Sequence, residues 1–173
     1  MSLFGKNVSV KLASVYKAGT NAGATATLLA VSGKTIYLES ISGFNDAAAI
    51  IEVRNSLTGT IAITNTDATI TGTGTAFTTE LIVGDTIRHT DSAEVFIVDS
   101  ITNDTSLEAT VAASSTDASS AAVRLVAEFK PAAAGNINIV VGGSLFGSRG
   151  TTLDVALLSS TADCSITATG YTL

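Results

Sequence analysis

The sequence is poor in the residue types that usually carry chemistry. It has no tryptophan, one proline, one cysteine and one histidine among 173 residues. One cysteine excludes a disulfide within the chain. Aromatic residues make up 5% and charged residues 14%, whereas about a quarter of a typical soluble domain is charged. A core must therefore be built from valine, isoleucine, leucine and alanine, which suits thin β-layers.

Positive charge is also scarce. Nine lysines and arginines oppose fifteen acidic residues, for a net charge of −6, and the basic residues are scattered along the chain. Binding to nucleic acid needs clustered basic side chains, so we expect no nucleic-acid partner. No apolar run approaches the ~20 residues that cross a bilayer, so we expect no membrane partner. Residues 1–10 lack the apolar segment of a secretory signal, which predicts a chain made in a reducing cytoplasm.

Serine, threonine, glycine and alanine take the place of the missing charges. A surface of such residues is cheap to desolvate, because few ions lose their water when another protein covers it. The composition therefore favours a protein with much of its surface against partners. The alternative is a threonine-rich β-protein that is free in solution.

The segment from Ile61 to Thr110 consists of short β-type runs separated by turn residues. It is rich in threonine, isoleucine and valine, with Gly84-Asp85 and Asn103-Asp104 between runs. This pattern predicts strands and tight turns. We expect five short strands here, forming a compact β-barrel or a small sandwich.

The segments on either side predict a second domain split in two. The joints, Asn55–Gly59 and Ser114–Ser120, are small, polar and turn-prone, as linkers are. We therefore predict a discontinuous β-sandwich frame, residues 1–57 and 121–173, interrupted by an inserted small β domain, residues 58–120 with its linkers. The alternative is one continuous sandwich with a long polar loop.

Alternating apolar residues predict the strands of this frame. We expect a hairpin turn at Ser32-Gly33, a turn over Ser42–Asp46, a strand end at Pro131 and a glycine-rich loop over Gly142–Gly150. Ile36 and Leu38 are predicted to share a face opposite Ile41. The expected strands are Asn7–Tyr16, Thr25–Val31, Lys34–Ser42, Ala47–Arg54, Ala122–Lys130, Ile137–Val141, Leu153–Leu157 and Cys164–Leu173. About eight strands with close turns favour an all-β, jelly-roll-like sandwich.

Three motifs suggest chemistry at first sight. The run Gly72–Phe77 begins like a dinucleotide fingerprint, but Phe77 replaces the third glycine and no helix is expected after it. His89 has aspartates near it in sequence, yet it lies at a polar strand end, and we expect it to be exposed. Cys164 falls on the apolar face of a strand, which predicts a buried small side chain.

The acidic residues also have plainer roles than catalysis or metal binding. Asp85, Asp99 and Asp104 lack the closely spaced acidic loop of a calcium site, so we interpret them as turn formers. Glu39 and Glu52 are expected to form exposed ion pairs with Lys34 or Arg54. We therefore assign no catalytic, cofactor-binding or metal-binding residue, expect no cofactor, and predict that the chain is not an enzyme.

Two stretches of the frame resemble a known class of proteins. Thr35–Gly43 and Asp163–Thr172, with the loop before Thr151–Val155, resemble small tailed-bacteriophage capsid decoration, or cement, proteins. The inserted segment is similar to a module of phage tail-fibre and other virion proteins, through Thr71–Phe77, Val83–Asp85 and Ile101–Leu107. The resemblance implies a virion structural protein on the outer surface of the capsid, assembled in the host cytoplasm. It implies the major capsid protein as partner, and a homotrimer.

The sequence thus supports three functional hypotheses. The first is a capsid decoration protein that stabilises the shell by binding only its assembled form. The second is a tail or neck fibre module that binds the host surface, a glycan or other virion proteins. The third is a polysaccharide hydrolase or lyase, which needs paired carboxylates; no such pair is identifiable in the sequence.

Overall fold

Strands dominate the computed structural model, which describes residues 9–17, 23–29, 32–45, 47–130, 134–147, 151–158 and 164–173. The fold is all-β, as predicted. By contacts the chain divides into two units, Met1–Asn55 with Val126–Leu173, and Ser56–Leu125. We call the first the frame and the second the barrel. The insert expected at 58–120 lies within the barrel unit.

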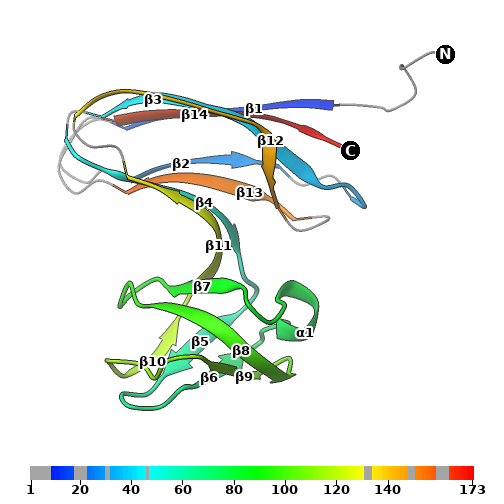
Figure 1. The fold of residues 1–173 in the computed structure, drawn as a ribbon, viewed down its shortest axis with the longest axis vertical. Helices are drawn as coiled ribbons and strands as arrows, with labels where there is room; N and C mark the ends of the chain where they lie inside the picture. Colours follow the sequence, from blue (N-terminus) through cyan, green and yellow to red (C-terminus); the bar gives the residue numbers. More distant parts are fainter. Residues whose placement is uncertain are drawn as a thin grey trace. The chain divides into compact units, whose positions relative to one another are not determined.

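Two antiparallel sheets face each other in the frame (Figure 1). One has the order β1-β14-β3-β12 and the other β11-β4-β13-β2. Their bounds are β1 Ser9–Lys17, β14 Cys164–Thr172, β3 Ile36–Asn45 and β12 Gly135–Phe146 in the first sheet, and β11 Ala122–Phe129, β4 Ile50–Ser56, β13 Leu153–Leu158 and β2 Gly23–Leu28 in the second.

Successive frame strands change sheet, with one exception. If the frame strands β1, β2, β3, β4, β11, β12, β13 and β14 are renumbered 1 to 8 in chain order, the two sheets have the strand orders 1-8-3-6 and 5-4-7-2. This is the strand order of a jelly roll, and it confirms the predicted jelly-roll-like sandwich. The exception is the step from β4 to β11, and this is the connection that carries the barrel.

The frame core lies between the two sheets. In β14 the buried and half-buried residues alternate without interruption from Cys164 to Thr172, because one face is inside and the other outside. The innermost side chains include Leu28, Ile36, Leu38, Ile41, Ile51, Val53, Leu153, Val155, Leu157, Ile166 and Ala168.

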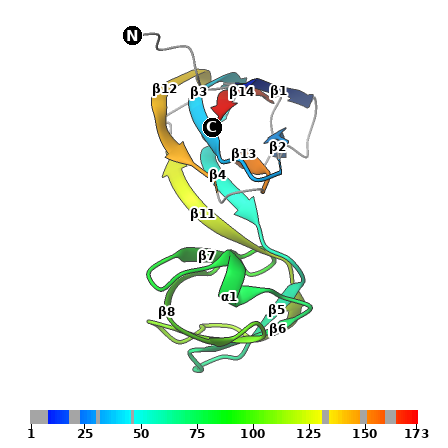
Figure 2. The same ribbon diagram turned by 90° about the vertical axis from the view of Figure 1, so that its right-hand side faces the viewer.

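The strand order of the second unit returns on itself and closes a small barrel (Figure 2). The order is β10-β5-β6-β9-β8-β7-β11. The strands are β5 Thr60–Ile63, β6 Thr69–Thr73, β7 Thr86–His89, β8 Val95–Asn103, β9 Ser106–Ala109 and β10 Asp117–Ser120. The two end strands, β10 and the start of β11, are consecutive in the chain and separated by Ala121 alone. Full closure protects strand edges that would otherwise be exposed.

The barrel has its own apolar core, which contains Phe77, Ile61, Ile63, Ile70, Ile87, Phe96 and Leu107. Two predictions about this unit are wrong. The segment expected to be a linker, Ser114–Ser120, contains β10, whereas the five strands expected between Ile61 and Thr110 are present as β5 to β9. A single helical turn, α1 (Phe77–Glu80), follows the glycine-threonine run, where no helix was expected.

Several local predictions in the frame are also wrong. The turn at Ser32-Gly33 exists, with Gly33 at φ 70°, but it does not make a hairpin, because β2 pairs with β13 and β3 pairs with β14 and β12. The alternation of apolar and polar residues predicts each strand, but it cannot show whether two successive strands pair as a hairpin or lie in different sheets. Ile41 is buried with Ile36 and Leu38, because a bulge near Glu39 shifts the register.

Two predicted breaks lie inside long strands. The expected turn at Ser42–Asp46 is strand as far as Asn45, and the expected loop at Gly142 is strand as far as Phe146. Gly142 and Gly143 have φ of 59° and 76° and interrupt the pairing of β12 without ending it. Pro131, Asp46 and residues 148–150 lie outside the described residues.

Candidate interaction surfaces

Three aromatic rings form a row across the outer face of the first frame sheet. Tyr37 on β3 is paired in register with Tyr171 on β14 and with Phe146 on β12. The Tyr37 and Tyr171 rings stack with centroids 5.4 Å apart and planes 10° apart, and the Phe146 ring lies 5.6 Å from Tyr37. Phe146 is 54% exposed. Stacked cross-strand aromatics stabilise the sheet and leave a rigid apolar row at its surface.

Neutral polar side chains surround the aromatic row. Ser40 and Thr169 are bonded through their hydroxyl oxygens at 2.6 Å across β3 and β14. The same outer face continues with Ser42, Phe44, Ser165, Thr167, Asn136, Asn138 and Val140, all exposed or half-buried. Glu39 at the bulge is the charged residue among the described outward side chains of β3, β12 and β14. A second protein can cover such a face with little ion desolvation.

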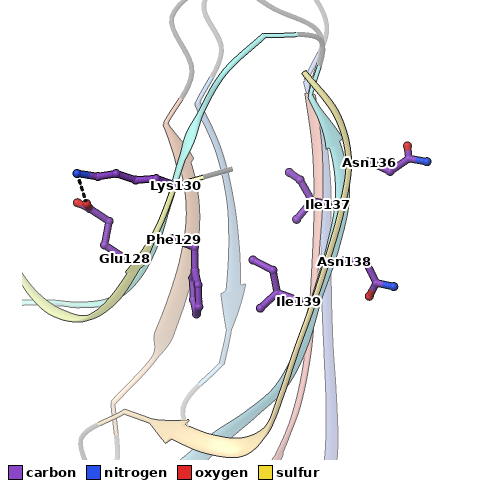
Figure 3. Close-up of a pocket in the computed structure, with 7 residues that line it drawn as sticks. All are labelled: Glu128, Phe129, Lys130, Asn136, Ile137, Asn138 and Ile139. Carbon is purple, nitrogen blue, oxygen red and sulfur yellow. Dashed lines mark ion pairs between the residues drawn. The ribbon is translucent and has the colours of Figure 1, made fainter. Parts of the chain in front are cut away.

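The frame also has an open pocket at one edge, between β11 and β12. Its volume is about 490 Å³, and it is lined by Glu128–Lys130 and Asn136–Ile139. Phe129, Ile137 and Ile139 point into it, while Asn136 and Asn138 point away (Figure 3). We call Phe129, Ile137 and Ile139, with the space between them, the edge pocket.

Exposed apolar side chains occur on the barrel as well. Ile82 and Val83 precede β7 and are 69% and 63% exposed. Val95 and Ile97 project outward from β8, alternating with buried Phe96 and Val98. Val111 follows β9 and is 68% exposed. The barrel thus keeps large apolar residues on its surface although its core is complete.

His89 is buried, and the prediction that it is exposed is wrong. Its side chain is 0% exposed, and its Nδ1 accepts a hydrogen bond from the Ser92 backbone N–H at 3.2 Å. The Ser92 hydroxyl lies 3.0 Å from the same nitrogen. The imidazole therefore holds the turn between β7 and β8 together, and its burial leaves no route for a substrate. The polar residues next to His89 in the sequence indicate a solvent-exposed side chain. In a closed barrel, however, every second residue of a strand faces the interior, and His89 is at such a position.

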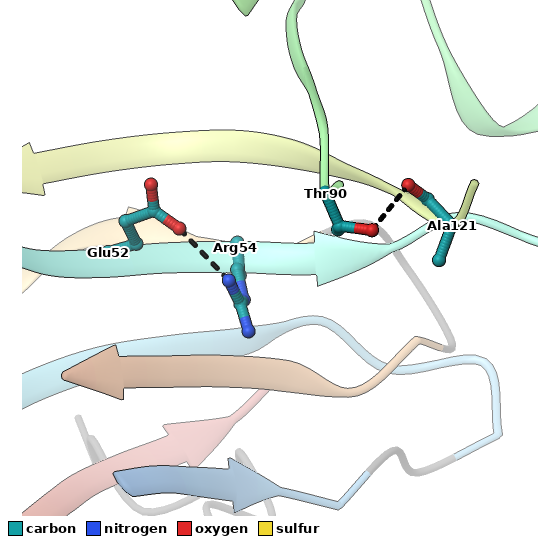
Figure 4. A network of polar contacts seen from close by, with 4 residues as sticks. All are labelled: Glu52, Arg54, Thr90 and Ala121. Atoms are coloured by element: carbon teal, nitrogen blue, oxygen red, sulfur yellow. Dashed lines mark hydrogen bonds and ion pairs between the residues drawn. The ribbon is translucent and has the colours of Figure 1, made fainter. Parts of the chain in front are cut away.

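Glu52 is buried too, although an exposed ion pair was predicted. Its side chain is 0% exposed and lies 3.0 Å from the Arg54 guanidinium, which is 19% exposed. In the barrel, the Thr90 hydroxyl donates to the Ala121 carbonyl at 2.9 Å. Figure 4 draws both contacts. Glu39 is exposed, as predicted.

Two of the three aspartates form turns, as predicted. Asp85 accepts from the Ile82 N–H at 2.9 Å and lies 2.9 Å from Arg124. Asp104 accepts from the Thr78 N–H at 3.0 Å and from the Thr78 hydroxyl, which anchors α1; these bonds, the hydroxyl first, lower the pKa of Asp104. Asp99 lies exposed on β8. Among the described residues, no group of three acidic, histidine or cysteine side chains is placed to hold a metal ion.

Cys164 is buried at the start of β14, as predicted. The described residues contain no helix long and apolar enough to span a membrane. Sequence reasoning missed the aromatic row, because it depends on strand register and because Phe146 had been placed in a loop. It missed the edge pocket because a gap between sheets leaves no periodic signal.

Comparison with known proteins yields little. No protein-family model matches the chain. No curated protein matches it either. Among solved structures, the chain is similar to one described as "Cyanophage Pam1 capsid asymmetric unit", with a TM-score of 0.27 and 15% sequence identity, over 99% of this chain and 89% of that one. A TM-score this low carries no argument about fold or function.

Proposed function

We propose that this chain is a non-enzymatic structural protein of a tailed-phage virion, a capsid decoration protein that binds the outer surface of the shell. The observation that carries the proposal is the outer face of β14, β3 and β12, whose described side chains are neutral apart from Glu39 and include the row of Tyr37, Tyr171 and Phe146. Such a face is suited to broad contact with another protein, because aromatic rings supply apolar area and hydroxyls supply hydrogen bonds without buried charge.

The sequence adds a second line of support. The frame resembles decoration proteins over Thr35–Gly43 and Asp163–Thr172, and within these stretches Ile36–Gly43 and Cys164–Thr172 belong to this sheet, as parts of β3 and β14. The contact face we assign is therefore built from the segments that carry the resemblance. Binding only to the assembled shell would stabilise it by mass action.

A charge placed on this face tests the proposal. Ser42 is exposed on β3, so Ser42→Glu leaves the core intact but buries an unpaired carboxylate in the contact. We expect binding to purified shells that lack this protein to weaken at least about tenfold, or about 1.4 kcal/mol. Co-sedimentation measures the binding, and heat resistance of the shells measures the stabilisation.

The matched control is Ser100→Glu, which adds the same charge at an exposed position of β8 in the barrel. We expect it to bind shells like the unaltered chain. The proposal fails if the unaltered chain does not bind shells, or if both variants bind as it does.

The second candidate is a tail or neck fibre module. The exposed Ile82, Val83, Ile97 and Val111 of the barrel favour it, because large apolar side chains at a surface often mark a protein contact. Electron microscopy of virions labelled on this chain distinguishes the two, since label on the head supports decoration and label on the tail supports the fibre module.

A further inference from the structure

Large aliphatic side chains of the barrel lie at its surface on β8, in the turn before β7 and just after β9. Strands β7 and β8 lie side by side in the barrel (Figure 1). A group of such side chains at a surface often marks a contact with another molecule. We call the group the barrel patch; its members, each between 46% and 69% exposed, are Ile82, Val83, Val95, Ile97 and Val111.

Backbone hydrogen bonds bring the three segments of the barrel patch together around Ile97. The Thr110 N–H donates to the Ile97 carbonyl at 2.9 Å, so the next residue, Val111, lies beside β8. On the β7 side, the turn before that strand is bonded to Val98, whose carbonyl accepts from the Gly84 N–H at 2.8 Å. The exposed residues of β8 therefore lie between the other members of the patch, and the five side chains are not scattered singly.

The barrel is much more acidic than the frame. The segment Ser56–Leu125 contains nine carboxylates, two arginines and no lysine, for a net charge of −7, whereas the rest of the chain has seven basic and six acidic residues, for a net charge of +1. Both arginines are half-buried. Arg88 is paired in register with Val95, and the side chain of Arg124 lies 2.9 Å from that of Asp85. The electrostatic field at the barrel surface is therefore negative.

Two carboxylates border the patch along β8 itself. Asp99 follows Ile97 by two residues and is exposed. Glu94 directly precedes the strand, and the hydrogen bonds from the Ser115 hydroxyl and then from the Ser114 N–H lower its pKa. Glu94 is therefore charged at neutral pH. Aliphatic and negatively charged groups thus alternate along this side of the barrel.

The negative charge decides which occupant suits the barrel patch. Nucleic acid and anionic membranes are repelled by such a surface. A second barrel carries the same charge and is repelled as well, and the basic residues of the frame are scattered along the sequence. A positively charged segment with apolar side chains matches both components of the surface, because lysine and arginine also bring apolar stems.

We propose that the barrel patch binds a basic, apolar segment of another protein. Aliphatic side chains of that segment cover Ile97 and its neighbours, and its lysine or arginine side chains reach Asp99 and Glu94. This inference is independent of the proposed decoration role, because the shell contact is assigned to the frame, and its test uses no shell.

Three labelled peptides of equal length test the chemistry of the partner. The first alternates lysine and leucine, the second glutamate and leucine, and the third lysine and serine. We expect the full chain to bind the first at least about tenfold more tightly than either of the others in fluorescence anisotropy, and added salt to weaken this binding. No binding of the first peptide, or equal binding of the first and either other peptide, would overturn the proposal.

Variants at exposed positions show where the lysine–leucine peptide binds. Ile97→Ser removes an outward apolar side chain and leaves the core intact, so we expect binding at least about fivefold weaker. Val83→Ser, in the turn before β7, should weaken it as well. Leu29→Ser is the matched control, because Leu29 is 67% exposed in the frame, and it should bind like the unaltered chain. Equal binding by all three variants would refute the site.

A charge variant and a membrane arm complete the test. Asp99→Asn should weaken binding of the same peptide and make it less sensitive to salt, whereas Asp99→Glu keeps the charge and should bind like the unaltered chain. Unchanged binding by Asp99→Asn would contradict the proposal. Vesicles of phosphatidylcholine and phosphatidylglycerol probe a lipid surface as occupant; co-sedimentation of the chain with them that Ile97→Ser abolishes would also overturn it.

Discussion

At the residue scale, a few carboxylates of the barrel act as acceptors for loop backbone. Glu94 accepts from the Ser115 hydroxyl and from the Ser114 N–H at 2.7 Å. These bonds, the serine hydroxyl first, hold the pKa of Glu94 below its ordinary value. Asp67 accepts from the Thr69 N–H at 2.9 Å, and its pKa is lowered in the same way. All these bonds fasten loops of the barrel.

The lowered pKa values predict acid sensitivity of the barrel. A depressed folded pKa contributes stability above the unfolded pKa, and this contribution is lost as the pH falls through the folded value. We expect Glu94→Gln to be less stable than the unaltered chain at pH 7, and the difference between them to shrink as the pH falls below 4.5, the ordinary pKa of a glutamate. Urea unfolding at a series of pH values measures this. Asp99→Asn, which removes an exposed carboxylate of β8, should keep the pH dependence; a Glu94→Gln profile parallel to the unaltered one would contradict the assignment.

Single residues were predictable from sequence where strand periodicity decides burial. Cys164 follows the alternation of β14 and is buried as predicted. The burial of His89 could not be predicted from its polar neighbours. It depends on closure of the barrel through β10 and β11, which pair with strands distant in the sequence. Its bond to Ser92 compensates for part of the desolvation of the ring.

At the element scale, two segments that contain glycine were predicted to be a turn and a loop, but they lie inside the strands β3 and β12. Glycine near polar residues usually marks a turn, but Gly43 lies inside β3. A Cβ at this position would lie 2.1 Å from the Ser165 carbonyl oxygen of β14. The glycine is therefore required by close approach of two strands rather than by a turn, and only the pairing of β3 with β14 reveals it.

The effect of an alanine at Gly43 on stability distinguishes a close contact between strands from a turn. In a solvent-exposed turn, Gly43→Ala would be tolerated, whereas between β3 and β14 it forces the backbones apart. We expect a loss of about 1–3 kcal/mol or more in the free energy of unfolding, as for other overpacked sites. Ser42→Ala, at the exposed neighbouring position, should change it by less than about 0.5 kcal/mol. Equal urea midpoints for the two variants would place Gly43 outside the contact.

At the scale of the whole molecule, the jelly-roll-like sandwich was predicted from composition and strand periodicity, whereas the order of the strands within each sheet was not. Short alternating runs with few aromatics predicted an all-β sandwich. The jelly-roll strand order follows from pairings such as β1 with β14, whose residues are far apart in the sequence. The aromatic row and the edge pocket depend on the same pairings, so they too were beyond the reach of sequence periodicity.

Two separate cores predict two separate unfolding transitions. The buried residues that pack around Ile166 all belong to the frame, and those around Leu107 all belong to the barrel. Both side chains are 0% exposed, so replacement of either by alanine should cost about 2–5 kcal/mol. We expect Leu107→Ala to lower the melting temperature of one transition and Ile166→Ala that of the other in differential scanning calorimetry. The two variants serve as controls for each other, because a single cooperative transition lowered equally by both would mean that the two cores unfold together.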